Sequence, residues 1–116
     1  MNITGMDKVE KIKVDMEGAK EVQRQLMIGS AHGSPSFSFR VFTIQPGGHT
    51  PHHSHPFEHL NYIIEGNAVV LDNDGRENPV KKGDFVLMPP NEKHQYRNAS
   101  PTDPFVMICA VPKEYE

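Results

Sequence analysis

The chain has 116 residues and a formal net charge of −3, so its length fits one domain and its charge offers no basic footprint for nucleic acid. No apolar run approaches the length of a membrane span, and the first residues lack the apolar core of a signal peptide. The single cysteine, Cys109, excludes an internal disulfide framework. We therefore expect a cytoplasmic protein with neither a membrane nor a nucleic acid as its partner.

The chain is predicted to fold as many short strands separated by tight turns. Ten prolines and nine glycines interrupt runs of aromatic and β-branched residues. Residues 1–6 are expected to form a loose leader, and residues 9–16 alternate well enough for a strand, although a helical turn also fits that length. Further strands are expected over residues 22–29, 36–45, 59–65, 68–71, up to 80, 85–88, 94–98 and 105–111. This spacing predicts one all-β domain over residues 1–116, a sandwich or jelly roll.

The run from residue 36 to residue 45 is the strongest strand by composition. Its apolar side chains occupy both faces, with Phe37, Phe39 and Val41 on one and Phe42 and Ile44 on the other. This pattern predicts a strand that is covered on both sides and that ends at Pro46-Gly47-Gly48. Arg40 is the exception, and it either snorkels at the mouth of a barrel or faces a metal cavity as a substrate anchor.

Five of the seven histidines lie between residues 49 and 59. In an extended chain His53 and His55 leave the same face about 7 Å apart, and a tight turn would return His59 beside them. Neutral imidazole is a common metal ligand, and three converging rings suit zinc, copper, iron, nickel or manganese. His94 is a fourth candidate that the fold would have to deliver. The other two histidines of the segment, at 49 and 52, are expected at the surface or beside the ligands.

Two spaced motifs carry a resemblance to a known family. The first runs from Gly47 to Gly66 and contains the histidines at 53, 55 and 59, and the second runs from Gly83 to Asn98 and contains Pro89 and His94. Together they resemble the two signature motifs of the cupin superfamily. Two departures stand out: a histidine occupies position 59, where most cupins have a glutamate ligand nearby, and Asn91 stands in place of a glycine. Asparagine tolerates the left-handed conformation that such a position needs.

The segment HSHPFEH, together with the tail that contains Cys109 and VPKE, is similar to the small four-histidine monocupins, a group typified by a manganese-containing cupin of a thermophile. The resemblance implies a double-stranded β-helix, a jelly-roll-like barrel that usually forms a homodimer. It also implies one divalent metal per chain, with manganese favoured and iron, copper, nickel or zinc left open. The implied ligands are His53, His55, His59 and His94.

The surroundings of such a site are less specified. In the resembling group the strand that contains Met107 and Cys109 faces the metal cavity, which makes both residues candidates for the lining, although buried lone cysteines are usually inert core residues. Tyr96 has the parity of His94, so it is either a hydrogen-bond partner of the ligands or a core residue. Arg40 completes the candidate lining.

These features leave three hypotheses about function. Four neutral imidazoles leave the full charge of the metal uncompensated, which favours anionic ligands, and in an octahedral shell they leave two positions open. The first hypothesis is therefore a metal-dependent oxidoreductase of the dioxygenase type that acts on a small organic substrate. A metal-dependent isomerase or decarboxylase would use the same positions. No acid, base or nucleophile is evident beyond the metal ligands, which keeps open a non-catalytic module that binds an anion or a sugar.

Overall fold

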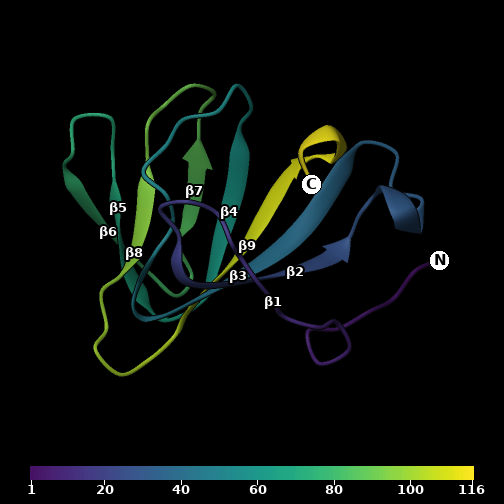
Figure 1. Cartoon of the computed structure of the whole chain (residues 1–116). Coiled ribbons are helices and arrows are strands. Elements are labelled where there is room, and N and C mark those ends of the chain that lie inside the picture. The colour runs from purple at the N-terminus through teal and green to yellow at the C-terminus, as the bar shows by residue number, and fades with distance from the viewer.

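The computed structural model describes residues 1–116, and its regular elements are almost all strands (Figure 1), which confirms the all-β prediction. One nine-stranded sheet curls into a single small barrel, and two single-turn 3-10 segments, η1 and η2, are its only helical elements. No helix is long and apolar enough to cross a membrane. The elements are β1 (Ile12–Lys13), β2 (Lys20–Ile28), η1 (Ser30–His32), β3 (Phe37–His49), β4 (His59–Glu65), β5 (Asn67–Leu71), β6 (Glu77–Lys81), β7 (Phe85–Met88), β8 (Gln95–Asn98), β9 (Phe105–Pro112) and η2 (Lys113–Tyr115).

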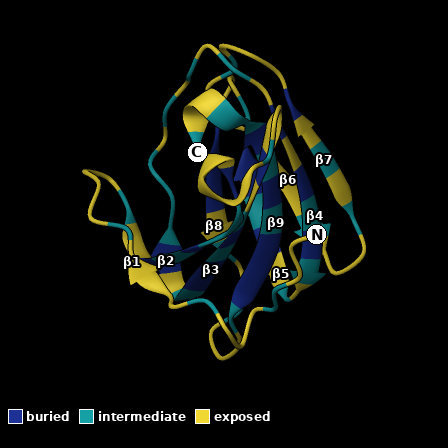
Figure 2. Cartoon of the chain, turned by 90° about the vertical axis from the view of Figure 1, so that its right-hand side faces the viewer, coloured by how far each residue is buried: buried dark blue, intermediate teal, exposed yellow.

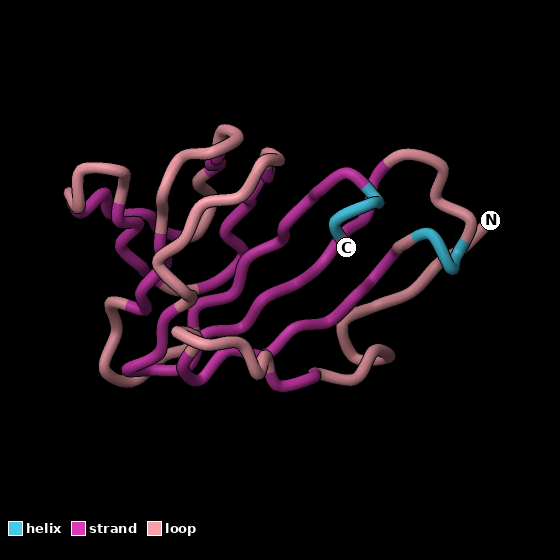
Figure 3. Tube along the Cα trace, turned by 45° about the horizontal axis from the view of Figure 1, so that its top comes forward, coloured by secondary structure: helices cyan, strands magenta, loops and turns pink.

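The strands pair antiparallel in the order β6-β5-β8-β3-β9-β4-β7, and β2 pairs with β3 on a branch of this path. Because β3 and β4 both flank β9, segments far apart in sequence become neighbours, as the trace in Figure 3 shows. The concave side of the curled sheet is packed with a cluster of buried apolar residues: Val22, Ile44, Ile63, Ala68, Val70, Met88, Tyr96, Phe105 and Met107. This packing holds in place the concave side of the sheet, where the histidines lie.

Strand β3 continues past the point where the sequence predicted its end. Gly47 has a φ of 80°, and a Cβ on Gly48 would lie 2.7 Å from the carbonyl oxygen of Lys20. The two glycines therefore allow a shift in register against β2 rather than a turn, and the strand runs on to His49. The expected end at Pro46-Gly47-Gly48 was wrong for this reason. The extension carries the chain across to β8, where His49 pairs with Arg97.

The predicted strand over residues 9–16 is reduced to the two residues of β1. The side chain of Gln25 donates hydrogen bonds of 2.8 Å to the carbonyl oxygens of Met6 and Val9. A buried side chain on β2 therefore satisfies backbone groups that a regular strand ladder would otherwise pair.

Later in the chain, Asn91 has a φ of 68°, as expected of an asparagine in place of a glycine.

The prediction that β3 is covered on both sides was wrong for its first residues, because Phe37 is 65% exposed and Phe39 is 49% exposed. Side chains that pair across β3, β9, β4 and β7 point to the same side of the sheet. Figure 2 shows exposed stretches on β7, whereas β9 is buried or half-buried along its length. We call the apolar residues on this side that are not buried the outer face, and its members are Phe37, Phe39, Leu60, Tyr62, Phe85, Leu87, Ile108, Ala110 and Pro112. Val41, Thr43 and Val106 on the same side are buried, and the exposed Glu65, which pairs with Val106 beyond a register shift, lies at the edge of this face.

Candidate metal centre

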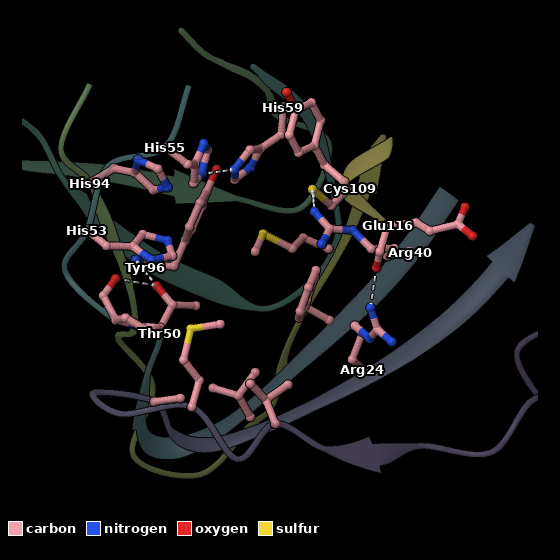
Figure 4. Close-up of a pocket in the computed structure, with 18 of the residues that line it drawn as sticks. Arg24, Arg40, Thr50, His53, His55, His59, His94, Tyr96, Cys109 and Glu116 are labelled. Carbon is pink, nitrogen blue, oxygen red and sulfur yellow. Dashed lines mark hydrogen bonds between the residues drawn. The ribbon is translucent and has the colours of Figure 1, made fainter. Parts of the chain in front are cut away.

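The fold brings three histidines from two distant segments into one cluster. His53 and His94 exchange two backbone hydrogen bonds, of 3.1 and 2.9 Å, which tie the segment after β3 to the residue before β8. His55 follows two residues later. One ring nitrogen from each of the three lies within 4.8 Å of the others, as close as ligands of a common metal ion need to be. Figure 4 shows these imidazoles converging at one end of a cavity.

His59 comes from the first position of β4 and lies against this cluster. Its ring stacks on His55 at 4.5 Å between centroids and stands 5.2 Å from the ring of His94. Its Nε2 atom is 2.6 Å from Nε2 of His55. Its Nδ1 atom is buried and has no hydrogen-bond partner, an arrangement that is costly unless something at the site uses the ring.

The protonation of the rings suits metal ligation. His55 and His94 each have Nδ1 at 2.8 Å from a backbone carbonyl oxygen, of Phe57 and Glu92 respectively. A carbonyl oxygen only accepts, so Nδ1 carries the proton and Nε2 presents its lone pair. Burial lowers the pKa of His94 to about 4, and burial together with the neighbouring His55 lowers the pKa of His59 to about 3. Neutral imidazoles held in one tautomer by backbone acceptors fit a divalent metal.

The cluster opens into a cavity of about 340 Å³ on the concave side of the sheet. The structure places Arg40, Tyr96, Met107 and Cys109 in its lining, together with the four histidines. Cys109 is buried opposite Arg40 in the β3–β9 ladder, and its sulfur accepts a hydrogen bond of 3.1 Å from Nη2 of Arg40. Burial raises the pKa of the Cys109 thiol, although the nearby guanidinium opposes the shift. A neutral thiol and a guanidinium therefore share this part of the wall.

Tyr96 contacts the site without bonding to a histidine ring. Its hydroxyl donates to Oδ1 of Asn61 at 2.7 Å, and both side chains are buried. Burial raises the pKa of Tyr96, so its hydroxyl stays protonated. The pair joins β8 to β4, the strand that begins with His59. Asn61 was not identified from the sequence, although its parity with the histidine two positions earlier is a usable signal.

The remaining histidines of the cluster segment lie outside the centre. His52 is exposed, and Nδ1 of His49 lies 3.3 Å from the side-chain nitrogen of Gln95. Neither belongs to the group of three that could hold a metal. These positions agree with the expected surface and supporting locations.

A stack of aromatic rings at the wall of the cavity also went unpredicted. The ring of Phe57 stacks on His55 at 4.1 Å, and Tyr115 of η2 stacks on Phe57 at 3.9 Å. Arg24, on β2, lines the same cavity and donates to the backbone carbonyl oxygen of Glu116. Phe57 could have been suspected from its position beside the histidines. No sequence signal places residues 115 and 116 there, because only the folded barrel brings the residues after β9 back to the cavity.

The fold and the site are those of a class of all-β barrel proteins that bind small molecules and metal ions at histidines on the inner wall. The chain belongs to the cupin family, since the cupin domain profile matches residues 40–111. It is therefore a cupin that has a cluster of three histidines suited to a metal ion, with a fourth histidine beside them.

Three similar proteins illustrate the range of the family. Gentisate 1,2 dioxygenase 1 of Aquipseudomonas alcaligenes is 31% identical over 90 residues, which are 71% of this chain but only 26% of that enzyme. An uncharacterized protein of Methanocaldococcus jannaschii is 29% identical over 105 residues, 89% of this chain and 82% of that protein. The solved structure of the polyketide cyclase RemF from Streptomyces resistomycificus has a TM-score of 0.90 and 28% identity, covering 97% of this chain and 79% of that one. The chain thus spans about a quarter of the dioxygenase's length.

Proposed function

We propose that the chain is a metal-dependent enzyme that converts a small organic substrate at a centre formed by His53, His55, His59 and His94. The observation that carries this proposal is the position of neutral imidazoles at one end of a cavity large enough for a small molecule. A divalent metal bound there would polarise a coordinated oxygen and, where it is redox-active, exchange electrons between substrate and dioxygen. The protein's part is to hold four imidazole donors at one end of the cavity and to enclose the substrate.

Manganese is the metal we favour, on the resemblance to the four-histidine monocupins. Nitrogen donors alone would bind copper and nickel more tightly, and iron and zinc also accept imidazole. Elemental analysis and metal-edge X-ray absorption on protein produced without an affinity tag test this. Near-stoichiometric manganese in a five- or six-coordinate shell supports the proposal. Four-coordinate zinc with imidazoles alone would indicate a closed structural site and contradict it.

The reaction we favour is oxidation by dioxygen. Outside the histidines the cavity offers little acid or base chemistry near neutral pH: burial raises the pKa values of both Tyr96 and Cys109, and the Glu116 carboxylate accepts hydrogen bonds from Ser30 and Ser38. Chemistry would then depend on the metal rather than on a positioned proton donor. Similarity to a gentisate dioxygenase over 90 residues supports this choice.

The test is oxygen consumption by protein loaded separately with manganese, iron, copper, nickel and zinc. Gentisate, catechol and an enolised 1,3-diketone are offered as substrates, and His55→Ala protein is the control. We expect uptake of dioxygen with at least one redox-active metal and none with the variant. If no metal gives uptake and no substrate alters the absorption spectrum, the oxidoreductase proposal fails.

A second candidate is ring closure or isomerisation with the metal acting only as a Lewis acid. It is favoured by the TM-score of 0.90 to the polyketide cyclase across 97% of this chain. The two reactions separate under anaerobic conditions, where a Lewis-acid reaction still gives product and an oxidation does not. A ligand that survives purification and is never converted would instead support a non-catalytic binding module.

We also propose that two copies of the chain pair through the outer face. Five of its members are large and exposed, at 49 to 80%, and the charged residue on this side of the sheet, Glu65, lies at its edge. At about 200 Å² for a fully exposed large side chain, they leave about 600 Å² accessible, close to the roughly 800 Å² that each partner of a stable dimer buries. A two-fold pairing sets this uncharged surface against itself. Sedimentation velocity should show a dimer, and a monomer at all concentrations would contradict the proposal.

A further inference from the structure

The charges that line the cavity do not balance. Apart from the histidines, the ionisable side chains of opposite sign in its lining are those of Arg24, Arg40 and Glu116. Arg24 donates to the main chain of Glu116, and the carboxylate of Glu116 is held by the hydroxyls of Ser30 and Ser38. No carboxylate reaches Arg40, and the single ion pair of the structure joins Lys81 to Asp84 at the surface. The cavity therefore contains an uncompensated cation.

The guanidinium of Arg40 also has donors to spare. It has five N–H groups, of which Nη2 reaches the sulfur of Cys109, a weak acceptor. Its Nε atom is buried and has no hydrogen-bond partner. A guanidinium does not lose its proton at any ordinary pH, so the protein cannot relieve this charge by neutralising it. An acceptor from outside the chain would supply what is missing.

Neighbouring side chains hold this group in one orientation. Cζ of Arg40 lies 5.0 Å from the centre of the Phe42 ring, a cation–π distance, and the Cys109 contact fixes the other side of the guanidinium. Because burial raises the pKa of the Cys109 thiol, the sulfur stays neutral and does not balance the charge. Figure 4 shows Arg40 and Cys109 at one side of the cavity and the imidazoles of His53, His55 and His94 at the other.

The space between the Arg40 guanidinium and the histidine cluster, which form the two poles of the cavity, is mostly apolar. Its volume of about 340 Å³ is at the small end of ligand sites, which suits a molecule of one or two rings. The lining away from the two poles is supplied mainly by Val14, Met16, Ala19, Val22, Phe42 and Met107. These side chains favour a ligand body that is itself apolar.

We propose that this cavity takes a flat organic carboxylate of one or two rings, with the carboxylate on the Arg40 guanidinium and the opposite edge of the molecule at the histidine cluster. Two parallel N–H···O bonds from the planar guanidinium match the two oxygens of a carboxylate. The inference names the substrate class of the proposed enzyme and so rests on that function for its catalytic meaning. The binding itself requires no turnover.

The experiment compares an acid with its uncharged amide. Binding of salicylate and salicylamide is measured by titration calorimetry to zinc-loaded protein, where no redox reaction intervenes, and to metal-free protein. Three variants are compared with the unmodified chain: Arg40→Met, Arg40→Lys and, as a matched control, Arg76→Met in the exposed β5–β6 turn. Circular dichroism establishes that each variant is folded.

We expect the unmodified chain to prefer salicylate in both metal states. Arg40→Met should weaken salicylate binding about 10- to 100-fold, the worth of hydrogen bonds to a charged group, and leave salicylamide binding unchanged. Arg40→Lys should fall between the two, and Arg76→Met should match the unmodified chain. If Arg40→Met does not fold, the acid and amide on the unmodified chain and on Arg40→Lys decide.

Several results would overturn the inference. Equal binding of acid and amide would do so, and so would failure of both to bind at millimolar concentration. A preference for the acid that exists only with zinc and survives Arg40→Met would place the carboxylate on the metal instead. A preference for the acid without any oxygen uptake would support the carboxylate inference and contradict the oxidoreductase proposal. Turnover of neutral substrates that is unaffected by Arg40→Met would support the proposed enzyme and contradict the carboxylate inference.

Discussion

The two faces of the same strands have opposite chemistry. On the inner face of β3 and β4, Arg40 and His59 place polar groups toward the cavity, whereas on the outer face Phe39 and Leu60 expose apolar side chains to solvent. An ordinary barrel does the reverse, because burying polar groups costs free energy and exposing large apolar patches invites association. The polar groups inside therefore support the proposed ligand, and the apolar groups outside support the proposed pairing of two copies.

The largest expected effect comes from removing a ligand on the inner face. His55→Ala takes one imidazole from the centre of the cluster, and we expect metal affinity to fall more than about 100-fold, beyond the usual cost of losing a residue that only supports a ligand. Folding should persist, because the apolar core lies elsewhere on the wall. Competition with a chromophoric chelator measures the affinity.

The exposed His52 provides the matched control, since it belongs to the same segment and lies outside the cluster. His52→Ala should bind metal as the unmodified chain does. Unfolding of the His55→Ala protein, or an equal loss in both variants, would contradict a site built into the cavity wall. Neither variant should change the association of the outer face.

Acidification is expected to destabilise the fold through the histidines of the inner face without acting on the outer face. The pKa of His59 is lowered to about 3 and that of His94 to about 4, both from 6.5, chiefly by burial. As pH falls below 6.5 the unfolded chain binds protons that the folded chain does not, so the free energy of unfolding decreases on acidification. Each histidine contributes a slope of about 1.4 kcal/mol per pH unit until its folded pKa is reached.

Urea unfolding of metal-free protein between pH 7 and pH 4.5 measures this slope. A free energy of unfolding that stays constant over that range would mean that the histidines are not buried as neutral rings. The members of the outer face carry no charge, so dimer dissociation should change little over the same range. A dimer that dissociates in step with the histidines would show that the two faces are coupled.

A charge on the outer face should act on association alone. Leu60 is 53% exposed near the middle of that face, and Leu60→Glu would bury a carboxylate in the proposed interface. We expect the dimer dissociation constant to rise about 10- to 100-fold, because an unpaired charge is costly to desolvate. Sedimentation velocity measures the change. Ile12→Glu is the control, since Ile12 is similarly exposed, at 59%, but lies on β1 outside this face.

An effect of similar size, on stability alone, is expected from the hydroxyl of Tyr96. Tyr96→Phe leaves Oδ1 of Asn61 buried without its donor, which should lower the free energy of unfolding by about 1–3 kcal/mol. Tyr62→Phe, on the half-exposed outer face, should stay within about 0.5 kcal/mol of the unmodified chain. Metal affinity is expected to be unchanged in both. A larger loss of metal affinity than of stability would give Tyr96 a direct role at the centre.

Much of the fold was predictable because turn residues mark the strand ends. Prolines and glycines limit most strands to within a residue or two, and the spacing of His53, His55 and His59 along the chain is enough to predict that their imidazoles lie near one another. The failures share a cause in tertiary contact. Gly47 and Gly48 have the composition of a turn but serve a register shift, which depends on the neighbouring strand.

The same limit applies to the site. His94 was reached only through the second motif, since nothing local connects it to residues more than thirty positions earlier. The apolar outer residues Phe37 and Phe39 were predicted to be covered, because alternation predicts which side a residue faces but not whether anything covers that side. Tyr115 reaches the cavity only through the path of β9 and η2, which no sequence pattern encodes.

The chain has no tryptophan and three tyrosines, and each tyrosine stands in a different region. Tyr62 belongs to the outer face, Tyr96 lies in the core beside the cavity, and Tyr115 stacks through Phe57 onto a metal-site ring. Their ultraviolet emission is therefore not masked by indole, and single Tyr→Phe changes assign it region by region. The protein thus contains an optical reporter for the proposed self-association, one for folding and one for metal binding at the proposed centre, with no label attached.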